Sequence, residues 1–526
     1  MKIGVLFFSL VACIQLHAQP FVRLYGGSAD EPAGFGSGYG GAPAVSAAYS
    51  PDGFIYLLSY TASNDSYINL NRGFDDILIL KLALNGDTVW SKTYGGTGNE
   101  RAYQIKLLSD NTLGIAGKTS SNDGQFTGSK GDSDGFFMRI NSNGDLVQFV
   151  RLGGSLVDSF YGFFEDDNNA FILFGETGSV DGDINQTSHA GSSEAWVVKI
   201  TSTGAIAWQD LTSGIVNNID WLEIFWDGVK LPGTNGYLLM GITGDFTDFN
   251  TDNILVVKYN PVGEKDFVKA YGSNVQDSPG GIAIKGNEIF ITARVGGTSS
   301  DVSDYNGGGA DIWLLKTDLE ANAIWNKSYG GTDVDYPYGV SIGQDGKVNI
   351  TGITRSTNNF AEAWEAKGGF DAWLVQVNSD NGDTLLTRRI GGTEADFAHY
   401  FLPTFDDSGY LVGRTRSNDG DMSLNNGGAD VFLSRVSYTE PLSNGKVKPI
   451  GFNLFPNPAQ DQIQIQLTDW SALTTVQVYN SLGQLVHTDQ FGGQNYQTSI
   501  SAWSSGSYVV SLNNGQQVSR LKLIKQ

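Results

Sequence analysis

The chain repeats one pattern seven times, with a period of about 59 residues. In each copy an acidic or amide residue precedes a short apolar run that ends in a cationic or polar residue. The seven segments are Asp76–Lys81, Asp134–Arg139, Glu194–Lys199, Asn253–Lys258, Asp311–Lys316, Asp371–Gln376 and Asp430–Arg435. Their last residues are 58, 60, 59, 58, 60 and 59 positions apart. A period this constant indicates copies of one supersecondary unit, each needing its neighbours to bury its apolar face.

One copy of the repeat contains four expected strands. They are separated by a loop at Gly330-Gly331, a polar loop and an Asp-Gly turn at Asp345-Gly346, and Asp-Gly turns are typical of antiparallel hairpins. The four segments are Trp325–Tyr329, Tyr338–Ile342, Val348–Thr354 and Asp371–Val377. Four strands per copy are typical of a propeller blade, and seven similar copies without distinct end repeats favour a closed ring over a solenoid. We therefore predict an all-β chain in which residues 19–438 form a seven-bladed β-propeller.

The two ends of the repeat region predict how the ring closes. Phe21–Tyr25 has the pattern of the first strand of a copy, whereas no such strand follows the last apolar run at Asp430–Val436. The N-terminal strand is therefore expected to complete the last sheet, which leaves neither of the two edges open.

Composition excludes several classes of function. The chain carries 33 basic and 56 acidic residues, a formal charge of −23, which repels phosphate backbones, so we expect no nucleic-acid partner. Its single cysteine, Cys13, lies in the expected targeting segment, so disulfides, cysteine catalysis and cysteine-rich metal sites are excluded from the mature chain. No later segment approaches the ~18 consecutive apolar residues of a membrane-spanning helix.

The N terminus has the pattern of a secretory signal peptide. Lys2 precedes an apolar run over 3–14, and Leu16-His17-Ala18 resembles a cleavage site. We expect residues 1–18 to be removed after Ala18. The alternative is a lipobox at Leu10–Cys13, with lipid attached to Cys13.

The run Ser328–Thr354, SYGGTDVDYPYGVSIGQDGKVNITGIT, resembles the SBBP-type β-propeller repeat of secreted bacterial proteins. The second and sixth copies match best, and the fourth copy, Trp208–Asn250, departs most. The resemblance implies a propeller fold and an extracellular location. It implies no activity, because the family shares none.

After Tyr438 the repeat stops. Residues 439–450 read as a linker, and 451–526 as a small immunoglobulin-like β-sandwich. This last part resembles the type A C-terminal sorting domain of the type IX secretion system of Bacteroidetes. The resemblance rests on the order and spacing of Pro456, Asn457, Pro458, Gly483, Gly506, Tyr508 and Lys522. It implies export through the periplasm to the outer-membrane surface or medium, with the type IX machinery as a partner.

Only one face of the expected ring carries long, variable loops, and this face is the first place to look for binding. Six copies also have an acid near the Gly-Gly loop, and the remaining copy has Asn218 there. The acids are Glu31, Glu100, Asp158, Asp277, Asp335 and Asp396. These acids suit either a carboxylate ring that gathers cations or one side-chain bond to loop amides per blade. We favour the structural interpretation, because a binding site usually breaks symmetry. No metal ligands or cofactor are assigned; SNDG-type loops make calcium the candidate cation.

Aromatic residues that break the repeat are the candidate binding residues. Trp221 and Trp226 belong to an expected loop at Asn217–Asp227, and Tyr305, Phe360 and Trp364 stand in other long loops. Aromatic planes among Asp and Asn suit a sugar, whose apolar ring face packs on an aromatic ring. The alternative is that these rings pack against neighbouring loops.

The sequence carries no recognised catalytic motif, so we predict a non-enzymatic binding or adhesion protein with a glycan or surface protein as partner. The main alternative is a secreted polysaccharide hydrolase or lyase that uses carboxylates on the long-loop face. A passive surface spacer is the third interpretation.

Overall fold

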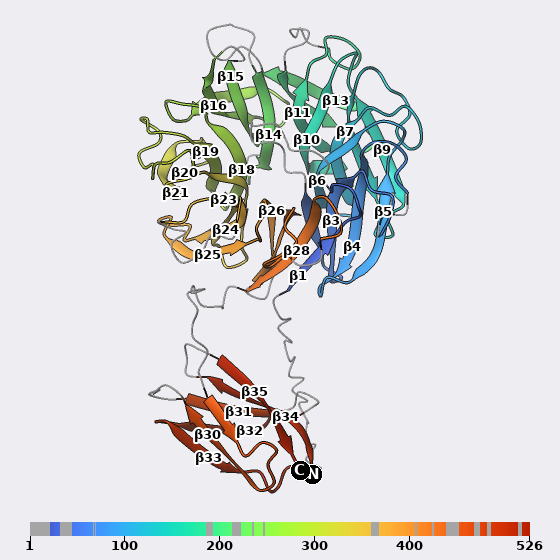
Figure 1. Cartoon of the computed structure of the whole chain (residues 1–526). Helices are drawn as coiled ribbons and strands as arrows, with labels where there is room; N and C mark the ends of the chain where they lie inside the picture. The colour runs from blue at the N-terminus through green and yellow to red at the C-terminus, as the bar shows by residue number, and fades with distance from the viewer. Residues whose placement is uncertain are drawn as a thin grey trace, which may run out of the picture. The chain divides into compact units, whose positions relative to one another are not determined.

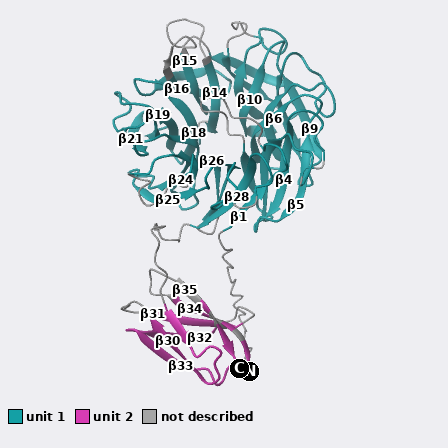
Figure 2. Ribbon diagram, viewed as in Figure 1, with its two compact units in different colours: residues 1–439 teal, residues 440–526 magenta. Residues whose placement is uncertain are grey.

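The structure is a computed structural model of the whole chain. It describes residues 21–31, 45–66, 68, 70–185, 193–212, 222–233, 236–245, 248–358, 368–404, 408–422, 425–437, 452–467, 474–480, 485–513 and 518–526. The chain divides into two compact units, residues 1–439 and 440–526 (Figure 2). The expected signal peptide and linker lie outside the described residues.

Regular structure in the described residues is β, apart from one 3-10 turn at Asp167–Asn169. The expected all-β class is therefore confirmed. Strands of the first unit form seven four-stranded antiparallel sheets (Figure 1). The first sheets contain β2 (Ser46–Ser50), β3 (Phe54–Thr61), β4 (Asp76–Ala83) and β5 (Thr88–Tyr94); β6 (Glu100–Leu107), β7 (Leu113–Thr119), β8 (Asp134–Ile140) and β9 (Leu146–Leu152); and β10 (Asp158–Glu165), β11 (Phe171–Thr177), β12 (Glu194–Ile200) and β13 (Ile206–Thr212).

The next sheets contain β14 (Leu222–Lys230), β15 (Tyr237–Asp245), β16 (Asp248–Tyr259) and β17 (Lys265–Tyr271); β18 (Ser278–Lys285), β19 (Glu288–Val295), β20 (Asp311–Thr317) and β21 (Ala323–Tyr329); and β22 (Asp335–Ile342), β23 (Val348–Thr354), β24 (Asp371–Val377) and β25 (Thr384–Ile390). The last sheet joins β26 (Asp396–Pro403), β27 (Ser408–Thr415) and β28 (Asp430–Ser437) to β1 (Val22–Tyr25).

The core is repeated between neighbouring sheets. Strand β20 is buried along its whole length, and its residues Ile312–Leu315 are all apolar because both faces of the strand are covered. Trp313 and Leu315 pack against the preceding sheet, whereas Ile312 and Leu314 pack against the following one. The first strand of each sheet contacts the first strand of the next, and β26 contacts β2. The sheets therefore surround a common centre (Figure 1).

Strand β1 closes this arrangement from the far end of the sequence. It pairs antiparallel with β28, from Val22 opposite Ser434 to Tyr25 opposite Val431. The expected completion of the last sheet by the N-terminal strand is confirmed. The pairing covers an edge that β28 would otherwise expose.

The second unit has two antiparallel sheets around one core. They contain β29 (Phe452–Phe455), β30 (Gln462–Leu467) and β33 (Asn495–Ser499), and β31 (Thr474–Asn480), β32 (Leu485–Phe491), β34 (Gly506–Asn513) and β35 (Val518–Lys525). Inward residues of both sheets, such as Ile463 and Val510, belong to one cluster. The residues of this cluster that the structure describes all belong to the second unit.

Two of the sorting-domain motif positions have structural roles. The amide oxygen of Asn457 accepts a hydrogen bond from the Ile524 N–H at 2.9 Å, and the buried Tyr508 donates its hydroxyl to the Ser504 carbonyl at 2.7 Å. Gly506 begins β34. Gly483 and the side chain of Lys522 lie outside the described residues.

Candidate functional site

The recurrent acids near the Gly-Gly loops hold those loops in place. Glu100 is fully buried, and its carboxylate accepts hydrogen bonds from the Gly96 N–H at 2.8 Å and the Thr119 hydroxyl at 2.6 Å. The same loop N–H bond, from a glycine four residues earlier, is made to Glu31, Asp158, Asp335 and Asp396. These contacts confirm the structural interpretation of the acids, since each carboxylate is occupied by its own sheet.

The expected residue of the fourth copy, Asn218, lies outside the described residues. In that copy Glu223 stands at the structural position of the acid. Glu223 is fully buried, and its N–H donates to the Ser193 carbonyl at 3.0 Å, as the Glu100 N–H does to the Asp75 carbonyl at 2.7 Å. The loop before Glu223 is longer than in the other copies, which displaces the acid along the sequence.

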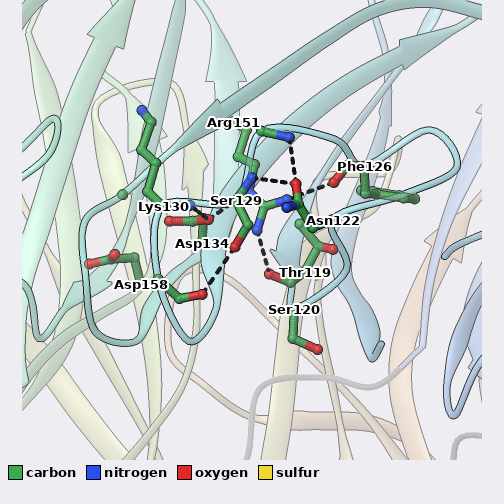
Figure 3. A network of polar contacts seen from close by, with 12 residues as sticks. Thr119, Ser120, Asn122, Phe126, Ser129, Lys130, Asp134, Arg151 and Asp158 are labelled. Carbon is green, nitrogen blue, oxygen red and sulfur yellow. Dashed lines mark hydrogen bonds and ion pairs between the residues drawn. The ribbon is translucent and has the colours of Figure 1, made fainter. Parts of the chain in front are cut away.

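The acid that begins the third strand of a sheet anchors a long loop. Lys130 donates its N–H to the Asp134 carboxylate at 3.0 Å, and Arg151 Nε donates to the same carboxylate at 2.6 Å. Arg151 Nη1 also donates to the carbonyls of Ser121 and Phe126, at 2.6 and 2.7 Å (Figure 3). The loop between β7 and β8 is thus tied to one buried ion pair.

Among the described residues, no group of three or more His, Cys, Asp or Glu side chains is placed to hold a metal ion.

Two of the five candidate aromatic residues are described. Tyr305 is half-buried against the core between β14–β17 and β18–β21, and its hydroxyl donates to the Gly308 carbonyl at 2.8 Å. Trp226 packs against the same core but lies within β14, not in a loop. The expected loop at Asn217–Asp227 is wrong at this end, because β14 pairs with β15 from Leu222 onward. Trp221, Phe360 and Trp364 lie outside the described residues.

Trp226 belongs to a set of residues at one structural position. The first strand of six sheets has a β-bulge at its third, fourth or fifth residue, where the extra residue is left out of the ladder. Val45, just before β2, takes the corresponding place. All seven residues line one cavity of about 60 Å³ where the seven sheets meet. They are Val45, Tyr103, Tyr161, Trp226, Gly280, Tyr338 and His399.

Aromatic rings are in contact around this central cavity. The ring centroids of Tyr103 and Tyr161 lie 4.8 Å apart, and Trp226 stacks on Tyr161 at 5.2 Å with 21° between the planes. On another part of the wall His399 stacks on Tyr338 at 4.8 Å. The cavity is large enough for a few water molecules but not for a sugar ring.

Ionisable side chains whose pKa values are shifted by burial also face the cavity. His399 is 3% exposed, and neither ring nitrogen has a hydrogen-bond partner among the described residues. Burial lowers the pKa of His399 well below its usual value, so the imidazole is neutral. Burial also lowers the pKa of Lys106 and raises that of Asp227. Such groups suit orientation of a polar ligand or of bound water.

Sequence reasoning missed this set of residues, although a signal exists. An aromatic residue follows the loop acid by three positions at Tyr103, Tyr161, Trp226 and Tyr338. The aromatic residue reads as part of an alternating strand, and only the bulge turns it toward the centre.

Among the described residues no helix is long and apolar enough to cross a membrane.

Comparison with known proteins defines the C-terminal part of the chain. Residues 453–526 match the family described as the secretion system C-terminal sorting domain. This match supports export by type IX secretion, and it indicates a secreted or cell-surface protein whose C-terminal part interacts with the type IX machinery.

The chain is also similar, at low sequence identity, to a curated protein and to solved structures. The chain is 22% identical over 399 residues to the regulatory protein FlaEY of Caulobacter vibrioides, across 67% of this chain and 40% of that protein. The chain thus spans less than half the length of this curated relative. Solved structures that share similarity include the quinohemoprotein alcohol dehydrogenase ADHIIG from Pseudomonas putida HK5, with a TM-score of 0.39, 12% identity and coverage of 77% of this chain and 68% of that one. Another is the subtype N11 neuraminidase-like protein of A/flat-faced bat/Peru/033/2010, with a TM-score of 0.35, 12% identity and coverage of 81% and 99%.

Proposed function

We propose that this chain is an exported, non-enzymatic β-propeller protein that binds a glycan through its long-loop face. In this proposal residues 1–18 are a signal peptide, 19–438 a seven-bladed propeller of SBBP type, 439–450 a linker, and 451–526 an immunoglobulin-like type A sorting domain of Bacteroidetes origin. Seven four-stranded sheets whose first strands surround one centre support the blade count.

The stacked pair Tyr161 and Trp226 is the observation that carries the binding function. Both rings come from bulges in the middle of the first strand of their sheets. Stacked aromatic rings flanked by polar loops suit the apolar face of a sugar. Trp221, Tyr305, Phe360 and Trp364 are the proposed contacts in the loops of the same face.

Binding to a polysaccharide panel tests this function directly. We expect the purified full chain to be retained by at least one polysaccharide, and the Trp226→Ala and Trp364→Ala variants to bind at least tenfold more weakly. Trp90→Ala is the control, because Trp90 donates its indole N–H to the Ser142 carbonyl at the opposite, tight-turn side of the sheets.

Two results would overturn the proposal. Release of reducing ends from a bound polysaccharide would make the chain a hydrolase or lyase instead. Failure to bind any polysaccharide, by a chain that is folded according to its circular dichroism, would favour a passive surface spacer.

A further inference from the structure

Two cations lie directly opposite each other in the second sheet. Arg101 in β6 pairs with Lys118 in β7, and like charges in this position destabilise an antiparallel pair. The equivalent pairs in other sheets are Ser159–Glu176, Ile224–Ile242, Ser278–Arg294, Tyr336–Ile353 and Phe397–Arg414. None of these combines two like charges, so the fold itself does not require the Arg101–Lys118 pair.

The two cations line a hollow of about 260 Å³ on the long-loop face. Asn99, Ser120 and Ser133 complete its lining. Every one of these five side chains offers a hydrogen-bond donor, and none is a carboxylate. The volume lies just below the ~300 Å³ at which small-molecule sites begin, which suits one sugar residue or a small anion.

Arg101 is held in position from behind. Its Nε and Nη2 donate to the Asp75 carboxylate at 3.2 and 3.0 Å, and its guanidinium lies 5.3 Å from the centre of the Tyr60 ring. The Asp75 side chain is only 8% exposed, so the carboxylate lies below the surface that Arg101 presents. Arg101 is therefore a fixed cation in the wall of the hollow.

Lys118 supplies the second positive charge of the hollow, but its ammonium group makes no hydrogen bond or ion pair with a described residue. Burial lowers the pKa of Lys118, attraction by Glu176 partly opposes this shift, and repulsion from Arg101 adds to it. Glu176 attracts Lys118, but its carboxylate accepts a hydrogen bond from the Tyr161 hydroxyl at 2.7 Å and forms no ion pair with Lys118. A partly buried cation without a partner is unfavourable unless a ligand supplies one.

We propose that this hollow binds the anionic group of an acidic sugar, either a carboxylate or a sulfate ester. Lys118 and Arg101 are its charge partners, and Asn99, Ser120 and Ser133 donate hydrogen bonds. The inference rests on the glycan-binding function proposed above and names the class of glycan. The net charge of −23 does not oppose it, because salt screens distant charges beyond ~8 Å at physiological ionic strength.

The test uses the full chain with sodium glucuronate, sodium sulfate and sodium chloride at equal ionic strength. We expect glucuronate or sulfate to raise the melting temperature relative to chloride, and the Lys118→Met variant to lose this shift. The free variant should be as stable as the wild-type chain or more stable, because the like-charge repulsion is gone. If Lys118 were only structural, the Lys118→Met variant would be less stable than the wild-type chain and would keep the shift.

Lys327→Met is the matched control. Lys327 in β21 forms an exposed ion pair with Asp383, which lies in the turn before β25. This variant should leave the shift unchanged. Ser120→Ala should weaken binding several-fold without changing the charge. Which salt gives the larger shift distinguishes a carboxylate from a sulfate ester as the ligand group.

The outcomes separate this inference from the proposed function. Binding of neutral polysaccharides only, with no shift in glucuronate or sulfate, would overturn the acidic-sugar site and leave glycan binding intact. A shift that Lys118→Met retains would also overturn it. A Lys118-dependent shift in a chain that binds no polysaccharide would support the anion site and overturn the glycan function.

Discussion

At the scale of single residues, buried carboxylates organise the loops of this protein. Glu100 accepts hydrogen bonds from a loop amide and from a threonine of the next strand, and its counterparts do the same in other sheets. The chemistry of these acids resembles that of a cation site when only the sequence is available. Their burial beneath loop amides identifies them as structural.

Replacement of Glu100 by alanine tests this role. The change leaves the Gly96 N–H and the Thr119 hydroxyl without an acceptor, and each such loss costs about 1–3 kcal/mol. We expect the free energy of unfolding in urea to fall by about 2–5 kcal/mol. Asp87→Ala, in an exposed hairpin, is the control and should change it by less than about 0.5 kcal/mol. A loss below about 1 kcal/mol for Glu100→Ala would contradict the assignment.

The pH dependence of stability follows from the same group of acids. Burial raises the pKa of Asp158, Asp277 and Asp396 to about 6, and that of Asp311 to about 7. A carboxyl whose pKa is higher in the folded state stabilises the fold below its unfolded pKa, and this contribution is lost as the pH rises through the folded pKa. The melting temperature of the larger unit should therefore fall between about pH 4 and pH 7.

Scanning calorimetry at constant ionic strength measures this trend. Asp311→Asn should reduce the slope, because asparagine does not titrate and occupies the corresponding position of another copy at Asn253. Acids with lowered pKa values, such as Asp110 and Asp318, titrate below this range and do not affect it. A melting temperature that rises from about pH 4 to pH 7 would show that these carboxyls are not desolvated.

At the scale of strands and loops, the repeat predicted most of what the described residues contain. The Gly-Gly loops, Asp-Gly turns and apolar runs place four strands in each copy, since each of these signals acts locally. The position of Glu223 and the strand that contains Trp226 were missed, because a longer loop shifts them along the sequence. The cavity lined by Tyr103, Tyr161 and His399 was also missed, since it depends on bulges in six strands that lie far apart in the sequence.

Removal of β1 tests how the last sheet is completed. A chain that begins at Gly26 lacks the strand that covers the edge of β28, and it also loses the packing of Val22 and Leu24 on the core. We expect it to unfold at lower urea concentration and to form oligomers on size-exclusion chromatography. A chain that begins at Phe21 is the control and should remain monomeric. Equal behaviour of the two chains would contradict the role of β1.

At the scale of the whole molecule, the two units have separate cores. The composition of residues 439–450 indicated this division, because the segment has little to bury. A chain that ends at Thr439 should therefore retain the melting transition of the larger unit within about 2 °C in calorimetry. A much larger decrease would mean that the two units stabilise each other.

The same truncation tests the sorting function in cells. Without residues 440–526 the protein should accumulate in the periplasm, because the part that matches the sorting domain is missing. Fractionation followed by immunoblotting measures this, with the full chain as control. Appearance of the truncated protein in the medium at wild-type level would contradict export through this domain.

The pairing of β1 with β28 also determines how the larger unit responds to a stretching force. Val22 lies opposite Ser434, so the chain enters and leaves this strand pair at the same end. A pull between Val22 and Ser437 loads the backbone hydrogen bonds one after another, as in opening a zipper, rather than all together in shear. Tension applied to both ends of the unit would thus open this one sheet first. Tension between the C-terminal end and a ligand bound to the loops would not pass through β1.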